Sequence, residues 1–207
     1  MYKKIIRYIN ILVLLLITAS CNNCYKAYKV DNDTLPADPM AYIYLQPYGD
    51  FTHEEAKALI PKIIKGLNKV YAGDWTNIKV LPNKPLPNKA FYEPKNRYLA
   101  NVLLHDLNIS KGQSYIIGLT HKDISMSIHG YDNYGIMGLS TSNMKSIVSD
   151  YRAKGDTFIA VIAHEFGHGF YKAEHCVDPM CIMCDYQIHK GKPFVYNICK
   201  EHKKVIF

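Results

Sequence analysis

Two histidines and a glutamate in the last quarter of the chain have the spacing of a metal site. The segment His164-Glu165-Phe166-Gly167-His168 reads HExxH, and histidines four residues apart on a helix project from adjacent turns toward the same point. Imidazole pairs of this kind suit zinc. The intervening Glu165 would lie beside a metal-bound water and take its proton as the hydroxide attacks a carbonyl. The pattern therefore predicts hydrolytic zinc chemistry with Glu165 as the general base.

A third ligand must come from chain that turns back after this helix. His175 lies in such a place and is followed directly by Cys176. A catalytic zinc ion takes three protein ligands and keeps one position open. We therefore expect His164, His168 and His175 to hold the ion.

The order of these and later residues resembles the archaemetzincin family of zinc metallopeptidases. The chain reads HEFGHGFYKAEHC, then Cys181-Ile182-Met183, and finally Cys199-Lys200-Glu201-His202. This is similar to the family signature HExxHxxGxxHC, followed by a cysteine, a nearby methionine and a closing CxxC. Upstream blocks such as residues 133–140 (NYGIMGLS) look alike as well, so the resemblance covers most of residues 41–207.

The resemblance implies a fold and a reaction. The fold would be an α/β metzincin-like mixed twisted sheet with an active-site helix and a loop-rich, zinc-stapled C-terminal part. The reaction would be hydrolysis of peptide bonds by a zinc-activated water, with Glu165 as general base. Met183 would be the Met-turn residue, which packs beneath the metal without binding it. A second, structural zinc ion would be held by Cys176, Cys181, Cys199 and His202, so that we expect two ions per chain.

The sequence departs from the family pattern around the third ligand. The gap from His168 to His175 is one residue longer, and Tyr171 stands where the family has glycine. Because glycine permits a left-handed turn at low cost, the turn back to the metal must be built differently here. Glu174 stands at the usual ligand spacing. It is the alternative third ligand, since carboxylates also bind zinc.

The cysteine-rich tail departs from the pattern too. The closing CxxC has become Cys199 to His202, which still offers a sulfur and a nitrogen to zinc. Cys184 is an additional cysteine, and it could replace Cys176 in a CxxC plus CxxH site. A further alternative is that the clustered cysteines form two disulfides, because an exported protein meets oxidising conditions.

The N-terminus has the features of an export signal. Three basic residues precede an apolar run at 9–17, and small residues stand before Cys21. We interpret residues 1–20 as a signal peptide of the lipoprotein kind, with Cys21 as the acylated residue and Cys24 as the alternative. The polar residues 21–40 would be a linker, and residues 41–207 the metallopeptidase domain. We expect an exported lipoprotein anchored to a membrane on the periplasmic or cell-surface side.

Charge and composition argue against nucleic-acid binding. The formal net charge of +7 falls by three, to +4, when the signal leaves with its three basic residues, and the lysines form no stripe with interleaved aromatics. We expect a monomer that acts on a peptide or protein substrate. Two alternatives stay open: a catalytically inactive zinc-binding surface protein, and a zinc hydrolase acting on a non-peptide bond.

Several elements must position these residues. Hydrophobic patterning predicts strands near residues 41–46, 77–81, 115–120 and 134–140, and helices at 52–71 and 96–107. A further helix would begin with Asp156 as its N-cap and run to about Phe170, with one apolar face and with His164 and His168 on another. By metzincin analogy, the strand at 134–140 would lie at the sheet edge and align an extended substrate.

Overall fold

The computed structural model describes residues 43–108, 115–128, 130–185 and 195–207. All of them belong to one compact unit of the chain. The predicted signal peptide, Cys21, Cys24 and the linker lie outside the described residues. Within the described ranges, no helix combines the length and apolar character needed to cross a membrane.

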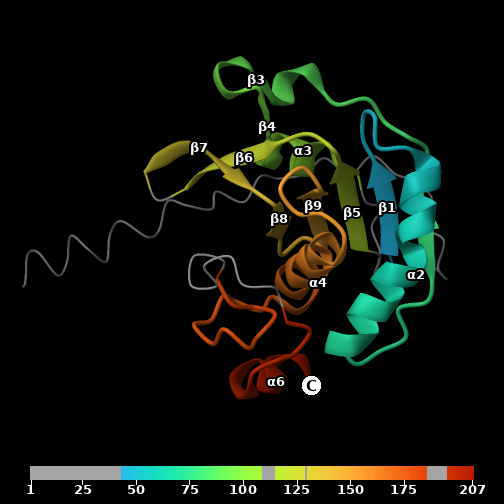
Figure 1. The fold of residues 1–207 in the computed structure, drawn as a ribbon, viewed down its shortest axis with the longest axis vertical. Helices are drawn as coiled ribbons and strands as arrows, with labels where there is room; N and C mark the ends of the chain where they lie inside the picture. The colour runs from blue at the N-terminus through green and yellow to red at the C-terminus, as the bar shows by residue number, and fades with distance from the viewer. Residues whose placement is uncertain (1–42, 109–114, 129, 186–194) are drawn as a thin grey trace, which may run out of the picture. The chain divides into compact units, whose positions relative to one another are not determined.

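A five-stranded mixed sheet forms the centre of this unit (Figure 1). Its strands are β1 (Ile43–Pro47), β2 (Ile78–Val80), β5 (Tyr115–Thr120), β8 (Gly138–Thr141) and β9 (Lys145–Ser149), in the order β2-β1-β5-β9-β8. Four strands run parallel, and β8 pairs antiparallel with β9 at one edge. Every residue of β5 and β9 is buried, as expected for strands covered on both faces.

Helices cover the two faces of this sheet. On one face, α2 (His53–Val70) and α4 (Asp156–Tyr171) share a core with the inward side chains of β1 and β5. The shorter α3 (Ala100–Asp106) packs into a second core on the other face. From Phe158 to Gly167 every residue of α4 is buried, which explains why this helix can hold a site rigidly.

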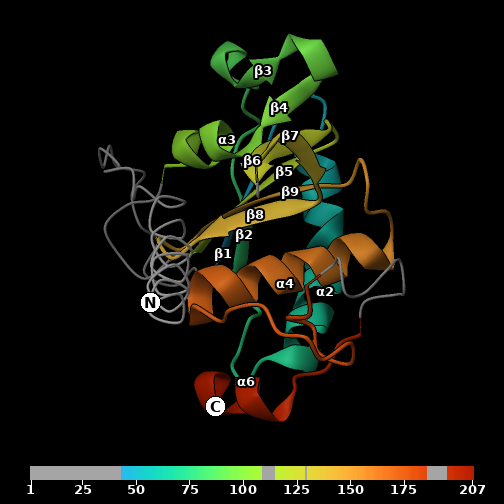
Figure 2. The same cartoon turned by 90° about the vertical axis from the view of Figure 1, so that its left-hand side faces the viewer.

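A smaller four-stranded sheet continues from the first. It contains β3 (Phe91–Tyr92), β4 (Arg97–Leu99), β6 (Ile124–Ile128) and β7 (Tyr131–Ile136) in the order β3-β4-β6-β7. Two short 3-10 helices, η1 (Asn88–Ala90) and η2 (Glu93–Lys95), flank β3. After β7 the chain bends at Met137 and enters β8. The C-terminal helix α6 (Lys200–Ile206) lies on the far side of α4 from the sheet (Figure 2).

The mixed α/β architecture confirms the expected fold class, and the strand at 115–120 is found as predicted. The predicted helix at 52–71 is also present, and Thr52 begins it with a capping box that includes Glu55. Pro61 lies inside this helix, which continues through it.

Other elements differ from the expectation. The predicted helix at 96–107 is wrong in its first half, because Asn96 adopts a left-handed conformation and β4 pairs with β6 before α3 begins. The predicted strand at 134–140 is two strands in different sheets. Asp156 is not the N-cap but the first residue of α4, after Gly155 at φ 57°. The C-terminal part, expected to be loop-rich, also contains α6.

Candidate metal centre

Three imidazole rings converge at the C-terminal half of α4. The Nε2 atoms of His164 and His168 are 3.0 Å apart, and the Nε2 atom of His175 lies 3.2 Å from the first and 3.0 Å from the second. His164 and His168 come from adjacent turns of α4, whereas His175 comes from the segment that follows the helix. The structure therefore brings together all three histidines singled out in the sequence.

The other ring nitrogens show which atoms carry protons. His164 Nδ1 lies 2.7 Å from the carbonyl oxygen of Ile182, and His168 Nδ1 lies 2.5 Å from that of Ala173. Because a carbonyl only accepts, both Nδ1 atoms carry the proton. Burial, with a contribution from His175, lowers the pKa of His168 to about 4 and so keeps this ring neutral. The unprotonated Nε2 lone pair of His168 therefore faces the other two rings.

Lone pairs held 3 Å apart repel unless a cation lies between them. Burial also lowers the pKa of His175, so a proton is a poor candidate for this cation. Three neutral imidazole nitrogens are the ligand set of many catalytic zinc ions, and the carbonyl partners at Nδ1 are the kind of support that orients such ligands. The residues present thus fit a zinc ion.

The longer spacing after His168 is accommodated by one extra residue of helix. Tyr171, in the position of the family glycine, stays helical and stacks on Tyr71 with the ring centres 5.0 Å apart. Lys172 takes the left-handed conformation instead, at φ 57° and ψ 27°, and the N–H groups of Lys172 and Ala173 both point to the carbonyl of Gly167. The turn is displaced by one residue, so His175 stands three residues after it and reaches the other two histidines.

Glu165 is buried beside this cluster and is 7% exposed. A Cβ atom on Gly138 of β8 would lie 2.7 Å from Glu165 Cγ and 2.8 Å from its Oε1. The carboxylate therefore fills the space that the missing side chain leaves on the edge strand. Burial raises the pKa of Glu165 to about 7, and a hydrogen bond with the Ser140 side chain opposes the rise.

Met183 packs directly beneath the histidine-bearing helix. It is fully buried, and its Sδ atom stands 2.5 Å from where a Cβ of Gly167 would be. The Tyr71 hydroxyl donates to the carbonyl of Ala163 at 2.7 Å and lies 3.8 Å from Met183 Sδ. The carbonyl next to Met183, that of Ile182, is the one that orients His164. This segment thus supports the helix without contributing a ligand.

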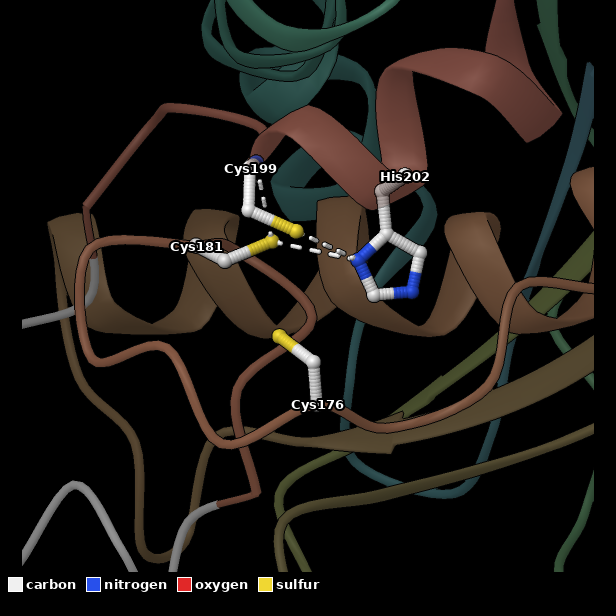
Figure 3. A group of neighbouring side chains, drawn as sticks. All are labelled: Cys176, Cys181, Cys199 and His202. Carbon is white, nitrogen blue, oxygen red and sulfur yellow. Dashed lines mark hydrogen bonds between the residues drawn. The ribbon is translucent and has the colours of Figure 1, made fainter.

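Three thiols and an imidazole form a second cluster below α4. The Sγ atoms of Cys176, Cys181 and Cys199 and the Nδ1 atom of His202 all lie within 4.8 Å of one another (Figure 3). His202 Nδ1 is 3.4 Å from Cys181 Sγ and 3.2 Å from Cys199 Sγ. Burial raises the pKa of the Cys176 and Cys181 thiols, so thiolates at these positions require a compensating cation. A tetrahedral Cys₃His zinc site fits this donor set.

The two clusters are joined by residues 174–176. His202 Nε2 donates to the carbonyl oxygen of Glu174 at 2.9 Å, so its Nδ1 lone pair faces the thiols. Cys176 belongs to the second cluster, and the preceding residue, His175, belongs to the first. A closed site at the thiols would therefore hold His175 in place for the first site.

The structure also shows where the two alternative ligands, Glu174 and Cys184, lie. The side chain of Glu174 is exposed and stands outside the convergent group. Cys184 is buried next to Cys176, with which it forms an isolated β-bridge, and its thiol contacts the carbonyl of Asp185 at 3.6 Å. In the described residues Cys176, Cys181, Cys184 and Cys199 are free thiols. Three of these thiols belong to the cluster that could hold a metal ion.

Sequence reasoning did not assign roles to four residues that support α4. These are Gly138 and Ser140 beside Glu165, Tyr71 beneath Ala163, and Tyr115, whose hydroxyl donates to the carbonyl of Glu165 at 3.0 Å. They come from the C-cap of α2, from β5 and from β8, and they lie between 25 and 92 residues away from their partners in sequence. No local pattern signals such contacts, although Gly138 and Ser140 lie in the block NYGIMGLS.

No protein-family model and no curated protein matches the sequence. Solved structures do match. An archaemetzincin from Methanopyrus kandleri is 20% identical with a TM-score of 0.61, and the match covers 83% of this chain and 97% of that one. An archaemetzincin from Archaeoglobus fulgidus, solved with malonate, is 20% identical with a TM-score of 0.58, covering 80% and 99%.

A zinc-dependent peptidase from Methanocorpusculum labreanum is similar to the same extent. It is 18% identical with a TM-score of 0.57, and the match covers 80% of this chain and all 100% of that one. At this level of sequence identity, structural similarity establishes the fold. The chain has the α/β fold of the archaemetzincins, over nearly the whole length of these structures.

Proposed function

We propose that this chain is a zinc-dependent metallopeptidase of the archaemetzincin family. One observation carries the proposal: three imidazoles, two from one helix and one from the segment that follows it, converge beside a buried carboxylate. The archaemetzincin fold and the similarity to a zinc-dependent peptidase support it. His164, His168 and His175 would hold the catalytic ion, with Glu165 as general base.

The chain's own residues supply the proton chemistry. A zinc ion, when bound, supplies a Lewis acid that polarises a carbonyl and lowers the pKa of a water. Glu165 would accept the water's proton at its carboxylate and later deliver it to the departing amine. A carboxyl group with a pKa near neutrality suits both steps. Gly138 leaves room for this carboxylate, and Tyr71 and Tyr115 hold the helix backbone on either side of His164.

The open edge of β8 would align the substrate. This strand is the last in its sheet, and its first residue touches Glu165. An extended peptide that added to this edge would receive main-chain hydrogen bonds and would run past the general base. The proposal thus favours a peptide substrate in extended conformation.

The second ion would be structural. A Cys₃His site with four protein ligands has no open position, and it would tie α6 to the segment that carries His175. Loss of this ion should therefore disturb the first site through the Glu174 carbonyl.

A peptide library tests the function. The full chain should cleave a mixed library, as read by mass spectrometry, and a chelator should stop it. Glu165→Ala should abolish cleavage while retaining both zinc equivalents, because the carboxylate moves protons and does not bind metal. Turnover unchanged in Glu165→Ala would refute the role of the glutamate. A wild-type chain that carries zinc yet cleaves no peptide would favour the inactive surface protein or, if it hydrolyses esters or other amides, the non-peptide hydrolase.

We further propose export, acylation at Cys21 and a monomeric domain held at a membrane surface, without nucleic-acid binding. The basic start, apolar run and small residues before Cys21 support this proposal. Cells grown with labelled palmitate should label the wild-type protein but not Cys21→Ser. Equal labelling of Cys21→Ser would point to Cys24, and unlabelled wild type would contradict the anchor.

A further inference from the structure

A polar cavity lies between β7 and the segment that joins β9 to α4. Its volume is about 460 Å³, and its lining includes Lys95, Arg97, Arg152, Asn133, Tyr131 and Tyr134. None of these residues belongs to either metal cluster. The two tyrosines are 69% and 47% exposed, respectively, so they stand at the rim and not in the core.

The two arginines are held rigidly by one buried carboxylate. Asp123, which is 9% exposed, accepts from Arg97 Nε at 2.7 Å and from Arg152 Nε and Nη2 at 2.7 Å each. Arg97 Nη1 donates to the carbonyl of Asn133 at 2.8 Å. Arg97 Nη2 and Arg152 Nη1 have no acceptor among the described residues. Each guanidinium thus keeps a donor for a ligand.

The lining carries a surplus of positive charge. Lys95 Nζ donates to the carbonyl of Asp132 at 2.8 Å, which is a neutral acceptor. The acidic groups are Asp123 and the exposed Asp132, against three cations. One positive charge is therefore unbalanced. The cationic side chains of the cavity are already held in place by their hydrogen bonds.

Two further features point to a ligand. Asn133 is 7% exposed and lines the cavity, and its side-chain amide makes no hydrogen bond with another described residue. Gly135 has no side chain where one would overlap the guanidinium of Arg152, so the cation lies directly on the β7 backbone. An amide that lines a cavity and has no partner in the protein is available to donate to a ligand.

The cavity lies within reach of a peptide at the proposed catalytic centre. Gly135 beside Arg152 is three residues before Gly138, which touches Glu165. Three residues of extended chain span at most about 10 Å. A substrate aligned on β8 would therefore reach the cavity about three residues from the bond that is cleaved.

From these observations we propose that this cavity binds a carboxylate of the substrate peptide, and that Arg97, Arg152, Lys95 and Asn133 make the chain selective for acidic peptides. The carboxylate would receive the free guanidinium donors of the arginines, and Lys95 would strengthen its attraction. This inference rests on the proposed peptidase function. Its ligand is one chemical group with two sources, an acidic side chain or the free C-terminus of a peptide.

Paired peptides test the selectivity. The first set replaces Glu with Gln at each position up to four residues on either side of a bond that the full chain cleaves. The second set compares a C-terminal carboxylate with an amide. We expect kcat/KM to be about tenfold higher for the acid of one pair, as for a partly buried charge-assisted hydrogen bond. The set in which the preference appears identifies the source of the carboxylate.

Variants connect the preference to the cavity. Lys95→Gln leaves the Asp123 pairs intact and should reduce the preference severalfold, whereas Arg152→Gln should abolish it. Lys62→Gln, on the exposed side of α2, removes the same charge elsewhere and should leave the preference unchanged. Because Arg152→Gln also weakens a buried ion pair, its thermal midpoint is measured alongside, and Lys95→Gln carries the test if Arg152→Gln is unfolded.

Binding separates this inference from the peptidase proposal. Anisotropy of labelled peptides is measured with the full-length Glu165→Gln protein, in which cleavage is expected to be absent. Tighter binding of the acid than of the amide, lost in Lys95→Gln, supports the cavity whether or not the wild type cleaves. Equal cleavage and binding of acid and amide overturns the carboxylate site and leaves the peptidase proposal standing. A preference for the acid that persists in both Lys95→Gln and Arg152→Gln would also overturn the carboxylate site.

Discussion

Substitution of Gly138 by alanine should disable the general base without removing metal. The new Cβ would lie 2.7 Å from Glu165 Cγ, 2.8 Å from Oε1 and 2.9 Å from Cδ. Ordinary carbon contacts begin near 3.4 Å, so the carboxylate must move by about 0.7 Å. Displacements of this size at a reacting group cost on the order of 10- to 100-fold in rate. We therefore expect kcat of Gly138→Ala to fall by that factor.

The same variant should keep its zinc and its fold. Gly138 is not among the residues with positive φ, so alanine meets no backbone strain and is compatible with a strand. Metal analysis should show the wild-type zinc content, and circular dichroism the wild-type spectrum. Steady-state kinetics with a peptide found in the library would measure kcat and KM separately.

A variant with a shorter carboxylate tests whether the contact between Gly138 and Glu165 causes the loss of rate. In Glu165→Asp the carboxylate is one methylene shorter and no longer fills the space next to Gly138. Adding Gly138→Ala to this variant should cost less than threefold, because the clash has been removed. An equal loss in both backgrounds, or full activity of Gly138→Ala alone, would refute the assignment of Glu165 to this position.

Three further outcomes follow from the structure. His175→Ala should lose one zinc equivalent by metal analysis while Glu174→Ala keeps both, and the reverse result would reassign the third ligand. Lys172→Gly should raise the free energy of unfolding by about 1 kcal/mol in urea titrations, because glycine adopts the left-handed conformation without the cost of a side chain; a loss of stability would contradict the turn. Burial would raise the pKa of Asp123, but the hydrogen bonds from Arg152 and Arg97 outweigh it and hold the pKa below its usual value. Because the folded pKa is depressed, this stabilisation is complete above the unfolded-state pKa of about 4 and is lost as pH falls through the folded value. Denaturation at pH 3 to 6 should show this loss of stability in the wild type. Asp123→Asn should be less stable at neutral pH, and its free energy of unfolding should fall less steeply as the pH is lowered.

Local spacing was sufficient to predict part of the site. An α-helix places residues four apart on the same side, so His164 and His168 were predictable as neighbours from the sequence. The helix at 53–70 was predictable for the same reason, because its capping box and apolar spacing are short-range signals. The burial of β5 followed from its continuous apolar run.

Features that depend on distant partners were not predictable in this way. Residues 97–99 have the composition of a helix start, yet they pair with β6, which lies 26 residues further along the chain. The bend at Met137 divides one apolar run between two sheets. Asp156 looked like a cap, but Gly155 before it, at φ 57° and ψ −127°, makes the turn into α4.

The sequence alone determined the chemical inventory: four histidines, a glutamate, three cysteines and a methionine in an order that resembles one metallopeptidase family. Tertiary structure decided which of them meet. Because the left-handed turn at Lys172 accommodates the extra residue, His175 reaches the other two histidines. The carbonyl of the preceding residue, Glu174, accepts a hydrogen bond from His202 and orients it. Gly138 meets Glu165, and Gly135 meets Arg152, only because separate segments of the chain pack together. Helical periodicity is a property of neighbouring residues, whereas convergence of separate segments depends on how the whole core packs.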